Sequence, residues 1–184
     1  MWNGNRHAGF PLQGFSEDFG QYCRTIENFP KDNISFKDIT PLLADNRAFR
    51  QSILKMCQPF YGKIDSIVCI EARGFLIGSA MAFNLCCGLI PVRKSGKLPY
   101  SVIRTEYEKE YGTDSLEIHA DAIHPDQKIL IVDDVLATGG TSKAIVDLVR
   151  RMHGNVIGCA FLGEITALKG RLKLDCPINS LITF

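Results

Sequence analysis

The 184-residue sequence predicts an α/β fold in which a mostly parallel central sheet carries helices on both faces. Two observations favour this fold class. Short runs rich in Ile, Val and Leu alternate along the chain with segments of helical periodicity, as in folds built from strand–helix–strand units. Polar residues and glycines follow directly after the apolar runs, where open parallel sheets bind their ligands. Because the chain has no internal repeat and no long linker, we expect one domain spanning residues 1–184.

The N-terminal half is expected to hold two amphipathic helices, a buried strand and a helix rich in small residues. The first helix would follow Ser16 as its N-cap and bury Phe19, Tyr22, Cys23 and Ile26. The second would follow Asp45 and bury Phe49, Ile53, Met56, Cys57 and Phe60. The strand is predicted over residues 64–70 and the small-residue helix over residues 74–87.

The C-terminal half repeats the alternation around a second buried strand at residues 129–132. Thr141 is expected to open a helix that ends near Gly154, a suitable C-cap. Its inward face would comprise Ala144, Ile145, Leu148, Val149 and Met152. Strands over residues 156–162 and 178–184 complete the predicted sheet.

One long polar segment interrupts this pattern at residues 95–117. It contains many charged residues and little apolar periodicity, and polar excursions of this length inside a domain are commonly functional lids. Leu116 and Ile118 resemble a returning strand. We therefore predict a lid carried on short β-arms.

The composition of the chain indicates which partners and which cellular compartment to expect. Hydrophobic residues make up 46% and charged residues 22% of the chain, and the net charge is +1, so neither nucleic acid nor an anionic membrane is expected as a partner. The seven cysteines are odd in number and lie mostly in apolar runs, which favours reduced thiols over a disulfide scaffold. No secretory signal precedes the fold, and the longest apolar stretch is too short to span a bilayer, so we expect a cytoplasmic protein.

The segment ILIVDDVLATGGTSKA, residues 129–144, predicts a phosphate site with a sugar site beside it. A buried strand delivers Asp133 and Asp134, and the turn Ala137 to Thr141 leads directly into a helix. Glycines allow the backbone to approach an anion, and the exposed N–H groups at a helix start attract it. The paired carboxylates lie where a sugar attached to that phosphate would place its hydroxyls.

A glycine-rich turn between a strand and a helix occurs in many α/β proteins, so on its own it is weak evidence for a phosphate site. The segment lacks the GK[ST] of nucleotide hydrolases and the GxGxxG of dinucleotide-binding folds. Two acidic residues followed by ATGGT form a much narrower pattern. It resembles the ribose-5-phosphate signature of the type I phosphoribosyltransferases.

Further segments resemble the adenine phosphoribosyltransferases within that family, in the family's order. IEARGF (residues 70–75) resembles their pyrophosphate loop, and FPKDNISFKDITPLL (29–43) their adenine-reading loop. VRKSGKLP (92–99) and EYEKEYGTDSLEIHADAI (106–123) resemble their second basic segment and catalytic lid. The resemblance implies a short N-terminal hood and covers residues 29–172, leaving residues 1–28 without a functional assignment.

The resemblance assigns these residues to four subsites. The ribose hydroxyls would be held by Asp133 and Asp134, and the 5′-phosphate by Ala137, Thr138, Gly139, Gly140 and Thr141. Pyrophosphate would be bound by Ala72, Arg73, Gly74, Arg93, Lys94 and Lys97, with Arg93 also able to reach a neighbouring subunit. Adenine would stack on Phe36, be read by the backbone of Ser35 and Lys37, and contact Leu162.

The resemblance also implies the chemistry and the assembly. Glu110 in the lid would be the general acid/base at N7 of adenine, with Tyr111 beside it. Mg²⁺ would arrive with phosphoribosyl pyrophosphate, the products would be AMP and pyrophosphate, and the enzyme would be a homodimer. The Glu71–Ala72 peptide is expected to be cis. Ala72 and Lys37 depart from the family's common Ser and Arg, and Tyr100 stands in the lid where Gly is frequent.

Two alternatives stay open at this point. A regulatory protein of the same fold would sense phosphoribosyl pyrophosphate and bind nucleic acid, but the near-neutral charge and the lack of a DNA-binding extension disfavour it. An enzyme acting on guanine, hypoxanthine or xanthine would differ in the base-reading loop.

Overall fold

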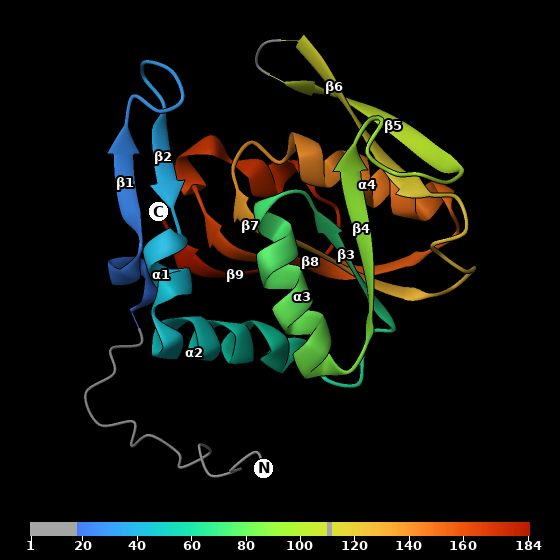
Figure 1. The fold of residues 1–184 in the computed structure, drawn as a ribbon, viewed down its shortest axis with the longest axis horizontal. Coiled ribbons are helices and arrows are strands. Elements are labelled where there is room, and N and C mark those ends of the chain that lie inside the picture. The colour runs from blue at the N-terminus through green and yellow to red at the C-terminus, as the bar shows by residue number, and fades with distance from the viewer. Residues whose placement is uncertain (1–17, 110–111) are drawn as a thin grey trace, which may run out of the picture.

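The computed structural model describes residues 18–109 and 112–184 as a seven-stranded sheet with helices on both faces, beside a separate two-stranded hairpin (Figure 1). The sheet order is β5-β6-β4-β3-β7-β8-β9. Its five parallel strands are β4 (Gly88–Lys94), β3 (Ser66–Ile70), β7 (Lys128–Leu136), β8 (Asn155–Glu164) and β9 (Ile178–Thr183). The prediction of a mostly parallel sheet is therefore confirmed, although it missed β4.

The two faces of the sheet have separate apolar cores. The helices α2 (Asn46–Cys57) and α3 (Arg73–Leu85) cover one face, and α4 (Gly140–Arg151) covers the other (Figure 1). Along β3, Ile67 and Cys69 belong to the core under α2 and α3, whereas Val68 and Ile70 belong to the core under α4. This alternation is the period-2 pattern of a strand, and burial on both faces explains why all of β3 is apolar apart from its first residue.

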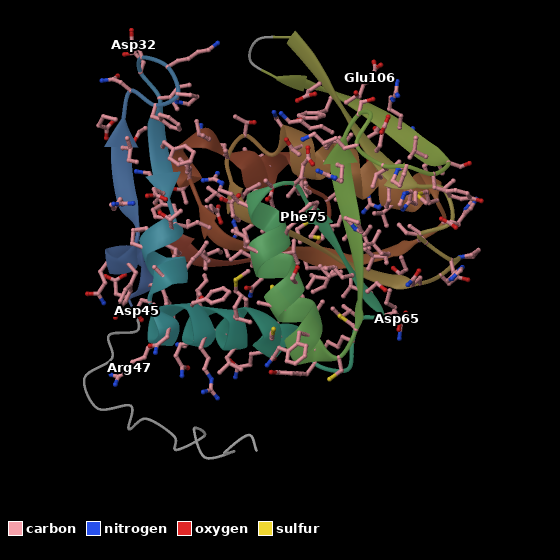
Figure 2. The ribbon with its side chains drawn as sticks, viewed as in Figure 1. Asp32, Asp45, Arg47, Asp65, Phe75 and Glu106 are labelled. Carbon is pink, nitrogen blue, oxygen red and sulfur yellow. The ribbon has the colours of Figure 1, made fainter. Side chains whose placement is uncertain are left out.

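The helix boundaries follow from local capping. The carboxylate of Asp45 accepts hydrogen bonds from the N–H groups of Arg47 and Ala48 at the start of α2, as predicted (Figure 2). The expected C-cap of α4 is wrong. His153 takes the positive φ of 63°, and the Gly154 N–H donates to Val149 O at 2.9 Å.

The N-terminal helix predicted over residues 16–26 is wrong for its described part. A short 3₁₀ helix η1 (Phe19–Tyr22) is capped by Asp18, and β1 (Arg24–Glu27) then pairs antiparallel with β2 (Ser35–Asp38). Ser16, the proposed N-cap, lies outside the described residues. The β1–β2 hairpin and the following α1 (Thr40–Ala44) form the N-terminal hood at one edge of the molecule (Figure 1).

The polar segment forms the predicted β-arms. Strands β5 (Val102–Lys109) and β6 (Gly112–His119) pair antiparallel and extend over α4 (Figure 1). The base of this hairpin, the predicted lid, is anchored by Glu117, which is 2% exposed and accepts hydrogen bonds from Ser95 Oγ, Gly96 N and Arg104.

Three further 3₁₀ helices connect these elements. They are η2 (Gln58–Phe60), η3 (Thr166–Leu168) and η4 (Gly170–Lys173). Within the described ranges, no helix is long and apolar enough to cross a bilayer.

Candidate functional site

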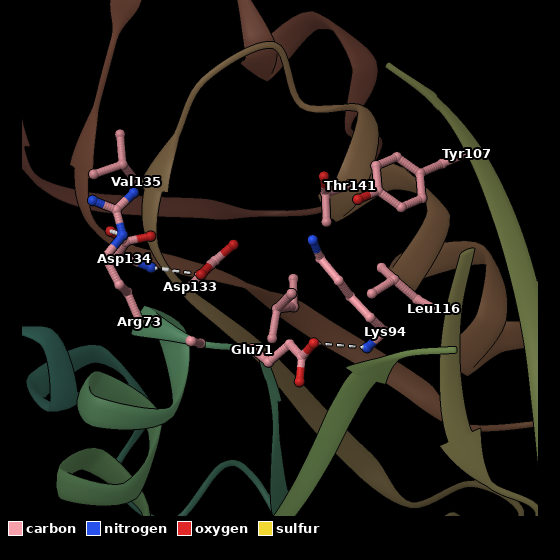
Figure 3. Close-up of a pocket in the computed structure, with 11 residues that line it drawn as sticks. Glu71, Arg73, Lys94, Tyr107, Leu116, Asp133, Asp134, Val135 and Thr141 are labelled. Atoms are coloured by element: carbon pink, nitrogen blue, oxygen red, sulfur yellow. Dashed lines mark hydrogen bonds and ion pairs between the residues drawn. The ribbon is translucent and has the colours of Figure 1, made fainter. Parts of the chain in front are cut away.

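The topology brings the polar residues that follow β3 and those late in β7 into one open pocket. The pocket has a volume of about 350 Å³ and is lined by Ile70, Glu71, Ala72, Arg73, Lys94, Tyr107, Leu116, Asp133, Asp134, Val135 and Thr141 (Figure 3). Because β3 and β7 are parallel neighbours, their carboxyl ends meet at the same edge of the sheet. The pocket unites residues from the predicted ribose, phosphate and pyrophosphate subsites.

The predicted phosphate loop, residues 137–141, connects β7 to α4. Gly139 has φ 77° and is the N-cap of α4, a conformation that side chains rarely adopt. No side chain caps the helix start, so its first N–H groups are not taken by a capping carboxylate or hydroxyl. The loop therefore offers backbone donors and the positive end of a 12-residue helix to an anion.

The two adjacent carboxylates lie within β7, which runs four residues further than predicted. The Asp134 N–H donates to Asp133 Oδ1 at 2.9 Å. Burial and the neighbouring Asp134 charge raise the pKa of Asp133 well above its ordinary range, and burial also raises the pKa of Asp134 although Arg73 opposes that rise. Gly74 leaves room for this arrangement, since a Cβ there would lie 2.7 Å from Asp133 Oδ1.

Arg73, the first residue of α3, contacts two of the other predicted subsites. Its Nε lies 2.8 Å from Asp134 Oδ2, an ion pair that lacks hydrogen-bond alignment (Figure 3). Its terminal nitrogen donates to Lys37 O at 3.3 Å, and its guanidinium carbon lies 4.6 Å from the centroid of the Phe36 ring. Arg73 thus connects the pyrophosphate loop to the ribose carboxylates and to the base-reading hairpin.

Glu71 contacts the basic residues at the end of β4 and just after it. Its buried carboxylate accepts from Arg93 Nε at 2.8 Å and from the Lys94 N–H at 3.1 Å, and it lies 3.2 Å from Lys97 Nζ. Burial opposes ionisation of Glu71, but the hydrogen bond from Arg93 and those from Lys94 and Lys97 leave its pKa below the ordinary value. The Glu71–Ala72 peptide is cis, as predicted.

Two predicted pyrophosphate ligands, Arg93 and Lys97, are therefore engaged with Glu71 in this structure. Lys94 points its amine into the pocket toward Thr141, and the amine also lies 3.8 Å from Asp114 Oδ2 (Figure 3). Glu71 itself was not among the predicted site residues, although it lies inside the IEARGF segment. Tyr107, Leu116 and Val135 also line the pocket without having been predicted.

The remaining predicted residues lie away from the pocket or outside the described part. Leu162 is fully buried in the core under α2 and α3, so the structure does not bring its side chain to the pocket. Ser35, Phe36 and Lys37 lie on β2, and Phe36 makes an edge-on contact with Phe29. Glu110 and Tyr111 lie outside the described residues.

Comparison with known proteins agrees with this geometry. Residues 35–174 match the family model of the phosphoribosyl transferase domain. The chain is 53% identical over 165 residues to an adenine phosphoribosyltransferase of Streptococcus uberis, an alignment covering 89% of this chain and 96% of the relative.

Solved structures of adenine phosphoribosyltransferases also superpose closely. The protein from Thermoanaerobacter pseudethanolicus is 51% identical with a TM-score of 0.88, covering 91% of this chain and 99% of that one. The Saccharomyces cerevisiae protein, complexed with D-2,5-dideoxy-2,5-imino-altritol 1,6-bisphosphate and adenine, is 39% identical with a TM-score of 0.83, covering 89% and 98%. The chain therefore belongs to the phosphoribosyltransferase family, among the adenine phosphoribosyltransferases.

Proposed function

We propose that this protein transfers the 5-phosphoribosyl group from phosphoribosyl pyrophosphate to adenine, giving AMP and pyrophosphate. The observation that carries the proposal is the pair Asp133–Asp134 placed between an uncapped helix start and the turn that opens α3. That arrangement matches a sugar carrying an anion at each end. In the reaction, the C1–O bond to pyrophosphate breaks, the bond from adenine N9 to C1 forms, and adenine loses a proton.

The ribose phosphate would occupy the β7–α4 junction. Residues 137–141 would donate N–H and hydroxyl hydrogens to the 5′-phosphate, with the α4 dipole behind them. Asp133 and Asp134 would accept hydrogen bonds from the 2′- and 3′-hydroxyls. Ribose hydroxyls would then donate hydrogen bonds to two carboxylates whose burial now opposes their ionisation.

Pyrophosphate would lie at the start of α3. The backbone of Ala72, Arg73 and Gly74 would face it, and Lys94 already reaches the pocket. Arg93 and Lys97 would have to leave Glu71 to join them. Positive charge in this place stabilises the negative charge that develops on the leaving group.

The donor set suits a magnesium ion that is shared with the substrate. Mg²⁺ is usually held by one or two carboxylates together with substrate phosphates, and the pocket offers Asp133 and Asp134. In residues 18–109 and 112–184, no cluster of three or more His, Cys, Asp or Glu forms a cage for a metal. When bound with phosphoribosyl pyrophosphate, the ion would neutralise charge on the departing pyrophosphate.

Adenine would bind beside the pocket, against β2, whose Phe36 ring and Lys37 carbonyl contact the pocket residue Arg73. Phe36 would provide a stacking surface, and the backbone of Ser35 and Lys37 would read the edge of the base. Arg73 now covers one face of the Phe36 ring, so a base on that face would take the guanidinium's place or share it. Closure of the lid would bring Glu110 and Tyr111 to the base and exclude water, which otherwise captures the cationic sugar.

We also propose a homodimer in the cytoplasm. Leu76 and Phe83 on α3 are 51% and 89% exposed, and Leu89 on β4 is 41% exposed, an apolar surface that a second copy would bury. The seven free cysteines suit a reducing compartment. Sedimentation velocity of the wild type and of Phe83→Asp tests the dimer.

The activity is tested directly with the purified protein, adenine, phosphoribosyl pyrophosphate and Mg²⁺. Chromatography should show AMP forming in step with pyrophosphate, and a chelator should abolish both. Absence of AMP under these conditions would refute the proposal.

A further inference from the structure

Two glycines from distant parts of the chain meet behind the predicted phosphate loop. A Cβ on Gly139 would lie 2.5 Å from Gly170 O and 3.1 Å from Gly170 Cα. A Cβ on Gly170 would lie far inside contact distance of Ala137 O and 3.1 Å from Gly139 N. The two backbones are therefore in direct contact, and neither position has room for a side chain.

The contact involves a residue that is not part of the pocket wall. Gly170 is buried and does not line the pocket, whereas Thr141, at the other end of the loop, does. The loop has no side-chain cap at Gly139. Packing against Gly170 is thus one of the constraints that fix where its backbone donors point.

Arg171 fixes the turn that carries Gly170. Its Nε donates to both carboxylate oxygens of Glu164 at 2.7 Å, and its terminal nitrogens donate to Ser180 Oγ at 2.6 Å and to Ile178 O at 3.3 Å. Glu164 is 6% exposed, and the hydrogen bonds from Arg171 lower its pKa, so the carboxylate stays charged. One guanidinium therefore ties the turn to both β8 and β9.

We propose that Gly170 is a positioning residue for the phosphate loop, held in place by Arg171, an inference that rests on the proposed function. The ligand it serves is the 5′-phosphate of phosphoribosyl pyrophosphate or AMP. Backbone N–H donors bind oxygen within a narrow range of roughly 2.7–3.2 Å. Because the turn is clamped, a methyl group at position 170 would displace residues 137–139, which it would contact, and misplace these donors.

The test is Gly170→Ala, with the two substrates measured separately. Displacement of the loop should raise KM for phosphoribosyl pyrophosphate by about 10- to 100-fold, in line with the cost of misplacing binding groups by up to about 1 Å. The KM for adenine should stay at the wild-type value. Ribose 5-phosphate should raise the Tm of the wild type but barely that of Gly170→Ala.

Gly158→Ala is the matched control. A Cβ on Gly158 would lie 2.8 Å from Pro177 O, also a close backbone oxygen, but Gly158 is in β8 away from the pocket. This variant should lose Tm while keeping both KM values and the Tm rise with ribose 5-phosphate. Arg171→Lys, which loosens the turn without adding atoms at the loop, should raise KM for phosphoribosyl pyrophosphate alone, by less than Gly170→Ala.

The inference is overturned if Gly170→Ala keeps wild-type KM for phosphoribosyl pyrophosphate, if both KM values rise together, or if Gly158→Ala shows the same KM rise. Should Gly170→Ala fail to fold, Arg171→Lys decides by the same criteria. A wild type that responds to ribose 5-phosphate but makes no AMP would refute the proposed function instead. The Tm measurement needs no turnover, so the two failures are distinguishable.

Discussion

Arg73 Nε lies 2.8 Å from Asp134 Oδ2 and joins the start of α3 to the carboxylate pair of β7. The Asp134 side chain is 6% exposed, so water solvates its carboxylate poorly, and the charge of Arg73 compensates that of the carboxylate. Asp134 would accept hydrogen bonds from the ribose hydroxyls, and Arg73 would bind pyrophosphate. The ion pair therefore connects the two ends of the proposed phosphoribosyl site.

Replacing Asp134 with Asn should separate ribose binding from phosphate binding. The amide keeps the shape but loses the charged acceptor for a ribose hydroxyl, a hydrogen bond worth about 1.5–3 kcal/mol. We expect kcat/KM for phosphoribosyl pyrophosphate to fall by about 10- to 150-fold on that basis, with an unchanged circular dichroism spectrum. Inorganic phosphate, as a competitive inhibitor, should keep its wild-type inhibition constant. Wild-type kcat/KM in this variant would remove Asp134 from the ribose site.

Asp133 should make the free protein less stable as the pH rises. Burial and the adjacent Asp134 raise its folded pKa above the unfolded value of about 3.9, so between these values the folded state holds more protons than the unfolded state. The free energy of unfolding then decreases with rising pH in that window. Asp133→Asn removes this decrease, so its Tm relative to wild type should rise as the pH increases above about 4, while activity is lost.

Glu164→Gln is a control of opposite sign. Hydrogen bonds from Arg171 lower the pKa of Glu164, so its stabilising charge is present above the unfolded pKa and is lost in acid. The Tm deficit of Glu164→Gln should therefore be larger at neutral pH than at acid pH. A Tm difference for Asp133→Asn that does not vary with pH would contradict the assignment of a raised pKa.

Gly139→Val should abolish binding of phosphoribosyl pyrophosphate. A Cβ at this position would lie 2.5 Å from Gly170 O, and valine would also be strained at the φ of 77°. Gly62→Val separates the two effects, because Gly62 has φ 67° but open space around its Cβ. The control should lose stability and keep substrate affinity. Normal binding by Gly139→Val in calorimetry would show that the phosphate site is elsewhere.

Glu110→Gln should lower kcat with little change in affinity for phosphoribosyl pyrophosphate. Glutamine keeps the size and hydrogen bonding of the side chain but cannot accept the proton, and loss of general acid/base catalysis typically costs about 10²–10⁴ in rate. Glu106→Gln and Glu108→Gln in the same lid are the controls and should remain close to wild type. A near-normal rate for Glu110→Gln, with the loss in a control instead, would assign the role to another lid carboxylate.

The parallel sheet and the phosphate loop were predictable because their signals are local. Residues 67–70 and 129–132 are apolar throughout, which only strands buried on both faces require, and ATGGT follows the paired aspartates after two residues. The prediction of an N-terminal helix was wrong because a non-local interaction decides the structure there. Ile26 fits helical spacing, but pairing of β1 with β2 overrode that pattern and left Ile26 39% exposed.

The interactions within the site were not predictable, since they join residues far apart in the chain. Nothing in RKSGK indicates that Arg93 and Lys97 converge on Glu71, and nothing in LKGR indicates that Gly170 backs the phosphate loop. Leu162 was assigned to the base by resemblance, yet β8 turns its side chain into the core. Sequence spacing identified the chemistry, whereas register and packing decided which groups meet.

The preference for adenine over 6-oxo purines tests the account most directly. Initial rates with adenine, hypoxanthine and guanine, each with phosphoribosyl pyrophosphate and Mg²⁺, give three values of kcat/KM. A 6-oxo purine reverses the donor and acceptor that backbone groups near Ser35 and Lys37 would meet, leaving two groups unpaired at about 1–3 kcal/mol each. Adenine should therefore exceed hypoxanthine by at least about 30-fold, which corresponds to the low end of that cost. Equal turnover of adenine and hypoxanthine would contradict the proposed base site.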